Sequence, residues 1–177
     1  MTKIPKDCII YPRHRGIPRS DRKVYYMTIT FVGHSYVRLN DAKERVKEEI
    51  IKNITISNTV TCYLGGYGNF DEICAYACKE LKKEGFLIKT VYVTPYITPR
   101  EQEKIKYMQL SSLYDESLYP PLENVLPKFA ISKRNEWMIT NADLIIAYVN
   151  HSYGGAYKTL KIAKRRKKKI VNICDFD

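Results

Sequence analysis

The spacing of apolar and polar residues changes several times along the chain, and each change outlines one element of a fold. Residues 27–34, MTITFVGH, form a short apolar run that is rich in β-branched residues, which predicts a strand. In residues 40–54 the apolar positions recur instead at helical spacing. Asp41 and Glu44 occupy the two positions of a capping box and predict where this helix begins.

The same patterns continue to the end of the chain. They predict further strands at 59–64, 86–96, 143–150 and 169–174, and further helices at 69–83, 130–140 and 154–168. Residues 97–129 are the least regular part, because PREQEKIKYMQL suits a helix whereas the proline-rich stretch after it does not. A long segment without its own period is often a functional loop or lid.

Strands that alternate with helices predict βαβ units and a parallel sheet covered on both faces. We expect a Rossmann-like three-layer α/β/α sandwich with the five predicted strands in the order 3-2-1-4-5. One domain, residues 27–177, would carry this fold, and residues 1–26 would be an N-terminal extension with three prolines. In such sheets, ligands bind outside the carboxyl ends of the strands.

Composition narrows the class of protein. The chain has 177 residues, of which 45% are hydrophobic and 28% charged, as is typical of a soluble globular protein. No apolar run approaches the ~20 residues that span a bilayer, and the N-terminus lacks the apolar core of a signal peptide. We therefore expect a cytoplasmic protein without a membrane partner. The five cysteines include no C-x-x-C pair, and we predict no metal site, no disulfide and no cofactor.

The net charge of +11 raises the question of an acidic partner. Residues 158–169 carry eight Lys and Arg side chains and no acid. Such a run can bind nucleic acid, or it can be the solvated C-terminal end of a helix, where the macrodipole favours cations. We favour the second interpretation, because no known nucleic-acid-binding signature accompanies the charge.

Three loops follow strands that should be central, at 33–38, 65–72 and 150–159. The second, GGYGNFDE, combines glycines, which let the backbone approach a ligand, with a helix N-terminus, which suits phosphate. The alternative is a tight turn in which Asn69 or Asp71 caps the helix. The third loop also has a Gly-Gly pair between a strand and a helix. Because two such loops would face one crevice, a ligand that carries a phosphate is favoured.

Several side chains near these loops could contribute chemistry. Arg134 could hold a phosphate with two hydrogen bonds and Asn135 could bind a base or ribose edge, although a surface arginine on a helix would have the same spacing. Asp71 and Glu72 begin a helix, where the dipole already stabilises acids. With a ribose nearby, a carboxylate could stabilise the oxocarbenium-like state of glycosidic cleavage. For His34, just past a strand end, a loop hydrogen bond is the commoner role.

The combination resembles the SLOG superfamily, which includes the lonely-guy phosphoribohydrolases, the DNA-processing protein A group and small bacterial and phage proteins. The resemblance covers roughly residues 27–174 and rests on LGGYGNFDE, SKRNEWM and ADLIIAYVNHSYGGAYKTLKIAKRRKKKIV. It implies a Rossmann-like fold that binds a nucleotide and, from the lonely-guy branch, a homodimer. In the small members the first strand often ends in Gly-x-Arg, whereas this chain has Gly33, His34 and Ser35, with His34 as the substitute.

The phosphoribohydrolase loop reads Pro-Gly-Gly-x-Gly-Thr-x-x-Glu. Its three glycines are matched here and its Glu is matched by Glu72, whereas Leu64 replaces the Pro and Asn69 the Thr. In those enzymes the Glu and an Arg hydrolyse the N-glycosidic bond of a nucleoside 5′-monophosphate. The resemblance therefore implies catalytic roles for Glu72 and Arg134, and the small members carry an acid at the position of Asp71.

Three functions remain open at this point. The protein could bind a nucleotide or nucleotide-derived molecule as a sensor, it could hydrolyse a nucleoside monophosphate, or, with the weakest support, it could bind nucleic acid through its basic ends. The candidate catalytic residues are Glu72, Arg134 and Asp71, and the candidate ligand-binding residues are Gly33, His34, Ser35, Gly65, Gly66, Gly68, Asn69, Asn135, Asn150, Gly154, Gly155 and Thr159.

Overall fold

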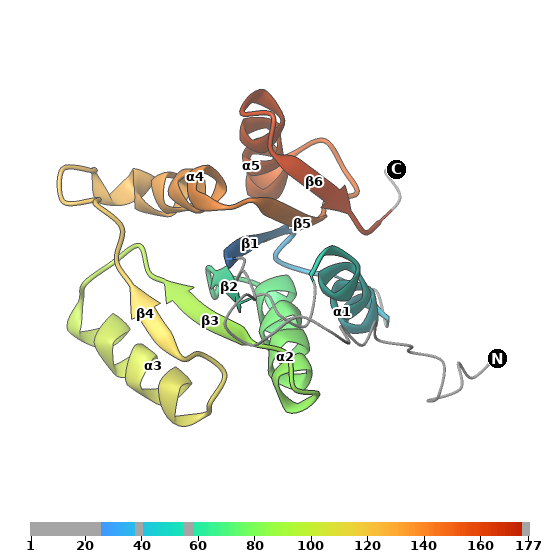
Figure 1. The fold of residues 1–177 in the computed structure, drawn as a ribbon. Helices are drawn as coiled ribbons and strands as arrows, with labels where there is room; N and C mark the ends of the chain where they lie inside the picture. The colour runs from blue at the N-terminus through green and yellow to red at the C-terminus, as the bar shows by residue number, and fades with distance from the viewer. Residues whose placement is uncertain (1–25, 38–40, 55–58, 175–177) are drawn as a thin grey trace, which may run out of the picture.

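A computed structural model describes residues 26–37, 41–54 and 59–174 of the chain (Figure 1). Its centre is a six-stranded sheet in the order β4-β3-β2-β1-β5-β6, and every pair of neighbouring strands is parallel. The strands are β1 Tyr26–Gly33, β2 Thr59–Leu64, β3 Ile88–Val93, β4 Glu116–Leu118, β5 Leu144–Tyr148 and β6 Lys169–Asn172. Because strands and helices alternate throughout, the predicted Rossmann-like fold class is confirmed.

Helices cover both faces of this sheet, as the predicted three layers require (Figure 1). They are α1 Ala42–Asn53, α2 Asn69–Lys83, α3 Pro99–Leu110, α4 Ala130–Asn141, preceded by the 3-10 turn Pro127–Phe129, and α5 Gly154–Arg165. The larger core lies under α1 and α2, and a smaller one lies between β5 and α5. Cys74 and Cys78 belong to the larger core with no exposed surface, so their part in it is as small apolar side chains.

The strand order differs from the prediction by one strand. The five predicted strands lie in the predicted order, and β4 adds a sixth at the edge beside β3. A three-residue strand carries no readable alternation, which is why the sequence did not reveal it. Asp115 holds it in place, because its carboxylate accepts hydrogen bonds from the Thr90 amide at 2.6 Å and the Thr90 hydroxyl at 3.0 Å.

Two local predictions had different outcomes. Asp41 is the N-cap of α1, but its side chain caps no amide of the helix; it pairs with Arg45 at 2.8 Å instead, so the capping box does not form. The charged partner one turn on competes successfully with the amide. The helix that PREQEKIKYMQL suits is present as the 12-residue α3, and Thr98 starts it by accepting a hydrogen bond from the Glu101 amide at 3.3 Å.

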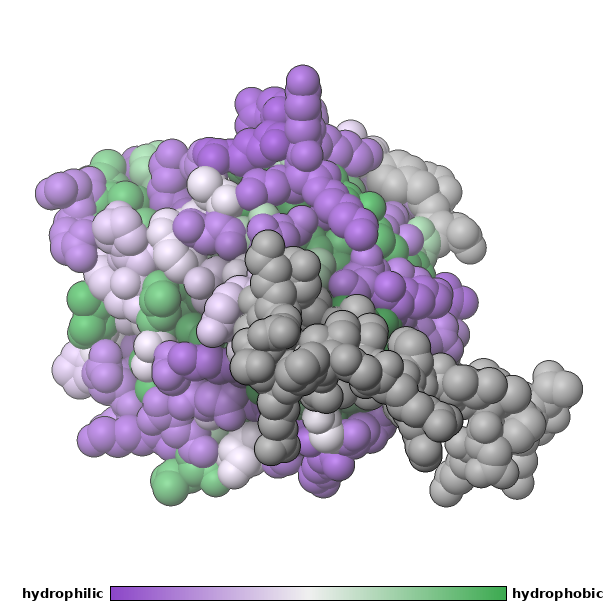
Figure 2. Space-filling view, in the orientation of Figure 1, coloured by the Kyte–Doolittle hydropathy of each residue, from purple (hydrophilic) through white to green (hydrophobic). Residues whose placement is uncertain are grey.

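The basic run near the C-terminus has a partly structural explanation. Arg166 contacts Glu136 at 2.7 Å, and the Lys168 ammonium donates to the carbonyls of Thr140 and Ala142 at 2.7 and 2.9 Å. These bonds attach the turn after α5 to the end of α4. The remaining cations face solvent, and Figure 2 shows hydrophilic side chains gathered over α5.

The structure also bears on two further expectations, which concern membrane-spanning helices and the N-terminal extension. Within the described ranges, no helix combines the length and the apolar character that crossing a bilayer requires. Most of the predicted N-terminal extension, residues 1–25, lies outside the part of the chain that the structure describes.

Candidate ligand-binding site

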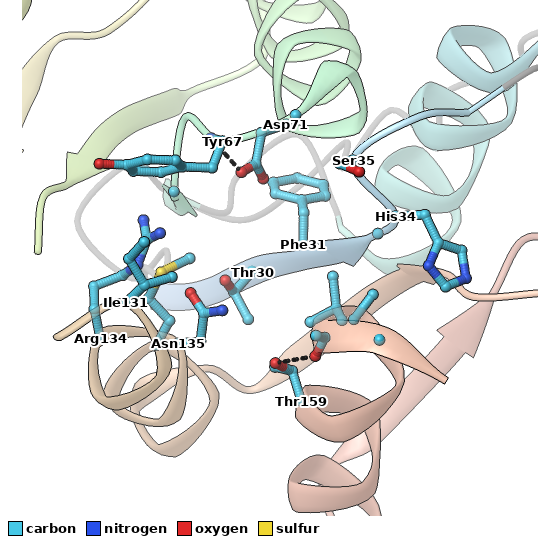
Figure 3. A pocket seen from close by; sticks show the side chains of 18 of the residues that line it. Thr30, Phe31, His34, Ser35, Tyr67, Asp71, Ile131, Arg134, Asn135 and Thr159 are labelled. Carbon is cyan, nitrogen blue, oxygen red and sulfur yellow. Dashed lines mark hydrogen bonds between the residues drawn. The ribbon is translucent and has the colours of Figure 1, made fainter. Parts of the chain in front are cut away.

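A cavity of about 660 Å³ opens at the carboxyl ends of β1 and β5 (Figure 3). Its walls come from the end of β1, the glycine loop between β2 and α2, the inner face of α4 and the first turn of α5. The predicted residues that line it are Gly33, His34, Ser35, Gly65, Gly68, Asp71, Arg134, Asn135, Gly154, Gly155 and Thr159. All three loops singled out in the sequence therefore meet at one pocket.

Arg134 is the most unusual residue of this pocket. It is only 1% exposed, and its Nη1 donates to the carbonyl of Val93 at 2.7 Å. Its Nε is buried and has no hydrogen-bond partner among the described residues. The ring of Tyr67 lies over the guanidinium, with its centroid 5.2 Å from Cζ. Burial lowers the pKa of Arg134 from its ordinary value, and the negative charge of Asp71 opposes that shift.

The glycine loop has the shape that Arg134 needs. A Cβ atom at Gly65 would lie 2.4 Å from Nη1 of Arg134, so only glycine leaves room for the guanidinium there. Gly68, with φ of +88°, occupies the N-cap position of α2, and a Cβ would lie 2.7 Å from Cα of Ser35. The glycines of this loop therefore permit close packing against α4 and against the segment that follows β1.

Asp71 lies across the pocket from Arg134, on the first turn of α2 (Figure 3). Its Oδ2 accepts a hydrogen bond from the Tyr67 amide at 3.0 Å. Burial raises the pKa of Asp71 above its ordinary value, while the Tyr67 amide, the charge of Arg134 and the amides of Gly65 and Gly66 act against the rise. The amides of the glycine loop are thus directed toward a carboxylate of the chain itself.

Four predicted residues do not line the pocket. Glu72 is exposed on α2. Gly66 packs close to Tyr92 instead. The side-chain oxygen of Asn69 accepts from the Val37 amide at 2.8 Å, and its Nδ2 donates to the Val37 carbonyl at 3.1 Å, so this side chain holds the segment after β1. The Asn150 amide donates to Nε2 of His34 at 3.3 Å and joins two loops.

The first turn of α5 forms the wall opposite the glycine loop. Gly154, Gly155 and Ala156 line the pocket there, and no side chain of the described residues caps the helix at Tyr153. The first amides of a helix lack partners within it and favour negative charge. The Thr159 hydroxyl, one turn further along α5, donates to the Gly155 carbonyl at 2.9 Å and so stabilises this first turn.

Sequence reasoning missed a stack of three rings at the same end of the pocket. His34 and His151 stack with centroids 3.6 Å apart and an interplanar angle of 20°, and Tyr153 stacks on His151 at 3.8 Å and 18°. Burial and the neighbouring His151 lower the pKa of His34. A signal was present in the sequence, because the tripeptide His-Ser-Tyr occurs both at 34–36 and at 151–153.

The side chains that line the pocket determine which chemical groups it can contact. Within the described residues, no three His, Cys, Asp or Glu side chains come together as metal ligands would. A guanidinium, a facing carboxylate, a helix N-terminus and several rings line one cavity. These groups can bind an anion, accept hydrogen bonds from hydroxyls and stack on a flat ring.

Comparisons with known proteins bear on the fold. No protein-family model matches the sequence, and the search of curated proteins gave no significant match. DNA processing protein A from Streptococcus pneumoniae is similar in structure, with a TM-score of 0.56 and 20% identity over 82% of this chain. The match covers 49% of that protein, so this chain spans about half its length.

Two further solved structures are similar. DNA processing protein A from Helicobacter pylori, a protein with a unique single-stranded DNA binding mode, has a TM-score of 0.56 and 18% identity, covering 85% of this chain and 68% of its own. The protein TM1055 has a TM-score of 0.50 and 14% identity, covering 81% of this chain and 72% of its own. At these identities the likeness concerns the fold. The described chain has the Rossmann-like fold of DNA processing protein A, as the resemblance to the SLOG superfamily predicts.

Proposed function

We propose that the pocket binds a small anionic molecule derived from a nucleotide, and that the protein serves as a sensor or binding module for it. One observation carries this proposal: Arg134 is a guanidinium at the pocket wall that is almost completely buried and has an unpartnered Nε. Burying a charge without compensating bonds costs several kcal/mol. A charged side chain buried at that cost is expected to have a use.

A bound anion would supply the bonds that Arg134 lacks. Among the described residues its hydrogen-bond acceptor is a neutral carbonyl, and it forms no ion pair, although the charge of Asp71 acts on it. A phosphate or carboxylate can accept two N–H bonds from the planar guanidinium at once. The unpartnered Nε of Arg134 therefore supports an anion as the ligand.

The rest of the pocket supports a ligand of the nucleotide type. Asp71 on the facing wall can accept hydrogen bonds from sugar hydroxyls, and the uncapped first turn of α5 favours phosphate. A cavity of about 660 Å³ is within the size range of small-molecule sites. A nucleotide combines the three groups that this pocket could contact: a phosphate, a sugar with hydroxyl groups and an aromatic base.

Hydrolysis of an N-glycosidic bond is the second candidate function. Asp71 supports it, because this carboxyl group has a raised pKa and faces Arg134 within the cavity. A carboxyl group with a raised pKa inside a cavity is suited to general acid–base chemistry. Since Glu72 is exposed outside the pocket, Asp71 would take the carboxylate role in such a reaction.

The test is a panel of nucleoside monophosphates, ADP-ribose and NAD, with thermal denaturation as the readout. At 100 times Kd a ligand adds about 2.7 kcal/mol to the free energy of unfolding. Arg134→Met should fold, because an apolar side chain of similar length often replaces a buried charge without loss. It should abolish the ligand-induced rise in Tm, and Lys133→Met, next to it on α4, should not. An equal rise in both variants would contradict the proposal.

Chromatography of the same mixtures separates the two functions. A ligand recovered intact from the protein supports the binding module. Release of a free base that is lost in Asp71→Asn and kept in Glu72→Gln supports the hydrolase. Release that depends on Glu72 alone would contradict the role given to Asp71.

A further inference from the structure

We propose that Tyr153 is the nucleobase-binding residue of the pocket, and that a base adds a fourth layer to the stack formed by His34, His151 and Tyr153. The inference rests on the proposed function, because it assigns one end of the same ligand. Its basis is the geometry of three nearly parallel rings at the pocket wall.

Tyr153 forms one end of the stack and has an open stacking face. His151 lies between the other two, so both of its faces are covered. Tyr153 is the outer ring: one face lies on His151 at a centroid distance of 3.8 Å, yet the residue is 70% exposed. Its exposed surface therefore includes the face that turns away from the stack. Every nucleobase has a flat π-face of this kind to offer.

The platform is held in position before any ligand arrives. The backbone amide of His34 donates to the Tyr148 carbonyl at 3.3 Å, and Nε2 of the His34 ring accepts from the Asn150 amide at 3.3 Å. These two bonds fix the His34 ring to the end of β5. Tyr153 is the N-cap residue of α5 and moves with that helix. A rigid ring loses little conformational entropy when a base stacks on it.

Tyr67, another ring of the pocket, is less available for a base. The Arg134 guanidinium lies 5.2 Å from its centroid, and the Lys104 ammonium lies 4.8 Å from it. Two cations already use its π-system.

The experiment compares AMP with ribose 5-phosphate, which has the same sugar and phosphate but no base. Stacking is worth about 1–3 kcal/mol per base, so AMP should bind about 5- to 150-fold more tightly to the native protein in calorimetric titrations. Tyr153→Ala should remove this preference and leave the affinity for ribose 5-phosphate unchanged. Tyr153→Phe should keep it, and so should Tyr107→Ala, which removes a tyrosine of similar exposure from α3.

The outcomes separate this inference from the proposed function. If AMP and ribose 5-phosphate bind equally, or if Tyr153→Ala keeps the preference, the base-stacking role is wrong and the anion site stands. If neither compound binds, both proposals are overturned.

A base could also come from a nucleic-acid strand, and a short single-stranded oligonucleotide tests that source. Loss of oligonucleotide binding in Tyr153→Ala, with AMP weak in the native protein, assigns the stack to a strand. Tight AMP binding that the oligonucleotide cannot displace assigns it to a free nucleotide.

Discussion

At the scale of single residues, the site depends on a fit between a glycine and an arginine that are far apart in the sequence. Gly65 belongs to the loop after β2 and Arg134 to α4, yet a Cβ on the first would lie 2.4 Å from Nη1 of the second. The absence of one methyl group lets the guanidinium reach the Val93 carbonyl. The glycine of the loop and the arginine of α4 therefore depend on each other for their positions.

Gly65→Ala should test this fit. The added methyl must displace Arg134 from its bond to Val93, and overpacking of this kind costs about 1–3 kcal/mol. For a chain of this size each kcal/mol lowers Tm by about 2–4 °C, and ligand binding should weaken as well. Gly155→Ala is the matched control, because a Cβ there meets nothing within 4 Å. Equal losses of Tm in the two variants would show that the contact with Arg134 is unimportant.

At the scale of elements, the end of β1 and the turn before α5 are joined by rings and backbone bonds. His34 follows β1, whereas His151 and Tyr153 precede α5. The parallel pairing of β1 with β5 places these two turns side by side at one edge of the sheet. His34 of the first His-Ser-Tyr tripeptide reaches His151 and Tyr153 of the second only because of this pairing.

The pH dependence of stability should reveal His34. Its pKa is lowered from 6.5 by burial and by His151, so the unfolded chain binds this proton more readily than the folded chain. The stability that the fold gains from keeping His34 neutral is fully present above pH 6.5. It is lost as the pH falls through the lowered pKa of His34 in the folded state. His34→Phe keeps a ring but cannot titrate, so it should lose less stability than the native protein in urea denaturation between about pH 8 and pH 5. Parallel losses in both proteins would contradict this.

At the scale of the whole molecule, the basic run divides into cations that hold the fold and cations that face solvent. Lys168 joins the end of α4 to the chain that enters β6 through two carbonyl oxygens, whereas Lys164 is exposed on the last turn of α5. Part of the charge therefore has a structural use.

Lys168→Gln should therefore be more harmful than Lys164→Gln. The first removes bonds from an ammonium to carbonyls at the end of α4, at a cost of about 1 kcal/mol or a fall in Tm of about 2–4 °C. The second should change Tm by less than the error of a duplicate scan, because it removes only a solvated charge. If the two variants lower Tm equally, the bonds of Lys168 do not stabilise the fold.

The sequence by itself determined the alternation of strands and helices, the order of five strands and the three loops that meet at the pocket. These features follow from local periodicity and from the handedness of crossovers, which act along the chain. The resemblance to the SLOG superfamily singled out Arg134, which by its spacing alone would count as a surface arginine, and Asp71 was visible as an acid at the start of a helix.

Only the tertiary structure decided how the loop and its acids are used. Asp71 faces the cavity while Glu72, one residue on, is exposed, because a helix turns about 100° per residue and the packing of α2 chooses which side chain faces inward. The burial of Arg134, the ring stack and the edge strand β4 likewise arise from contacts between segments far apart in the chain. Such contacts depend on where elements meet in space, and no local pattern records that.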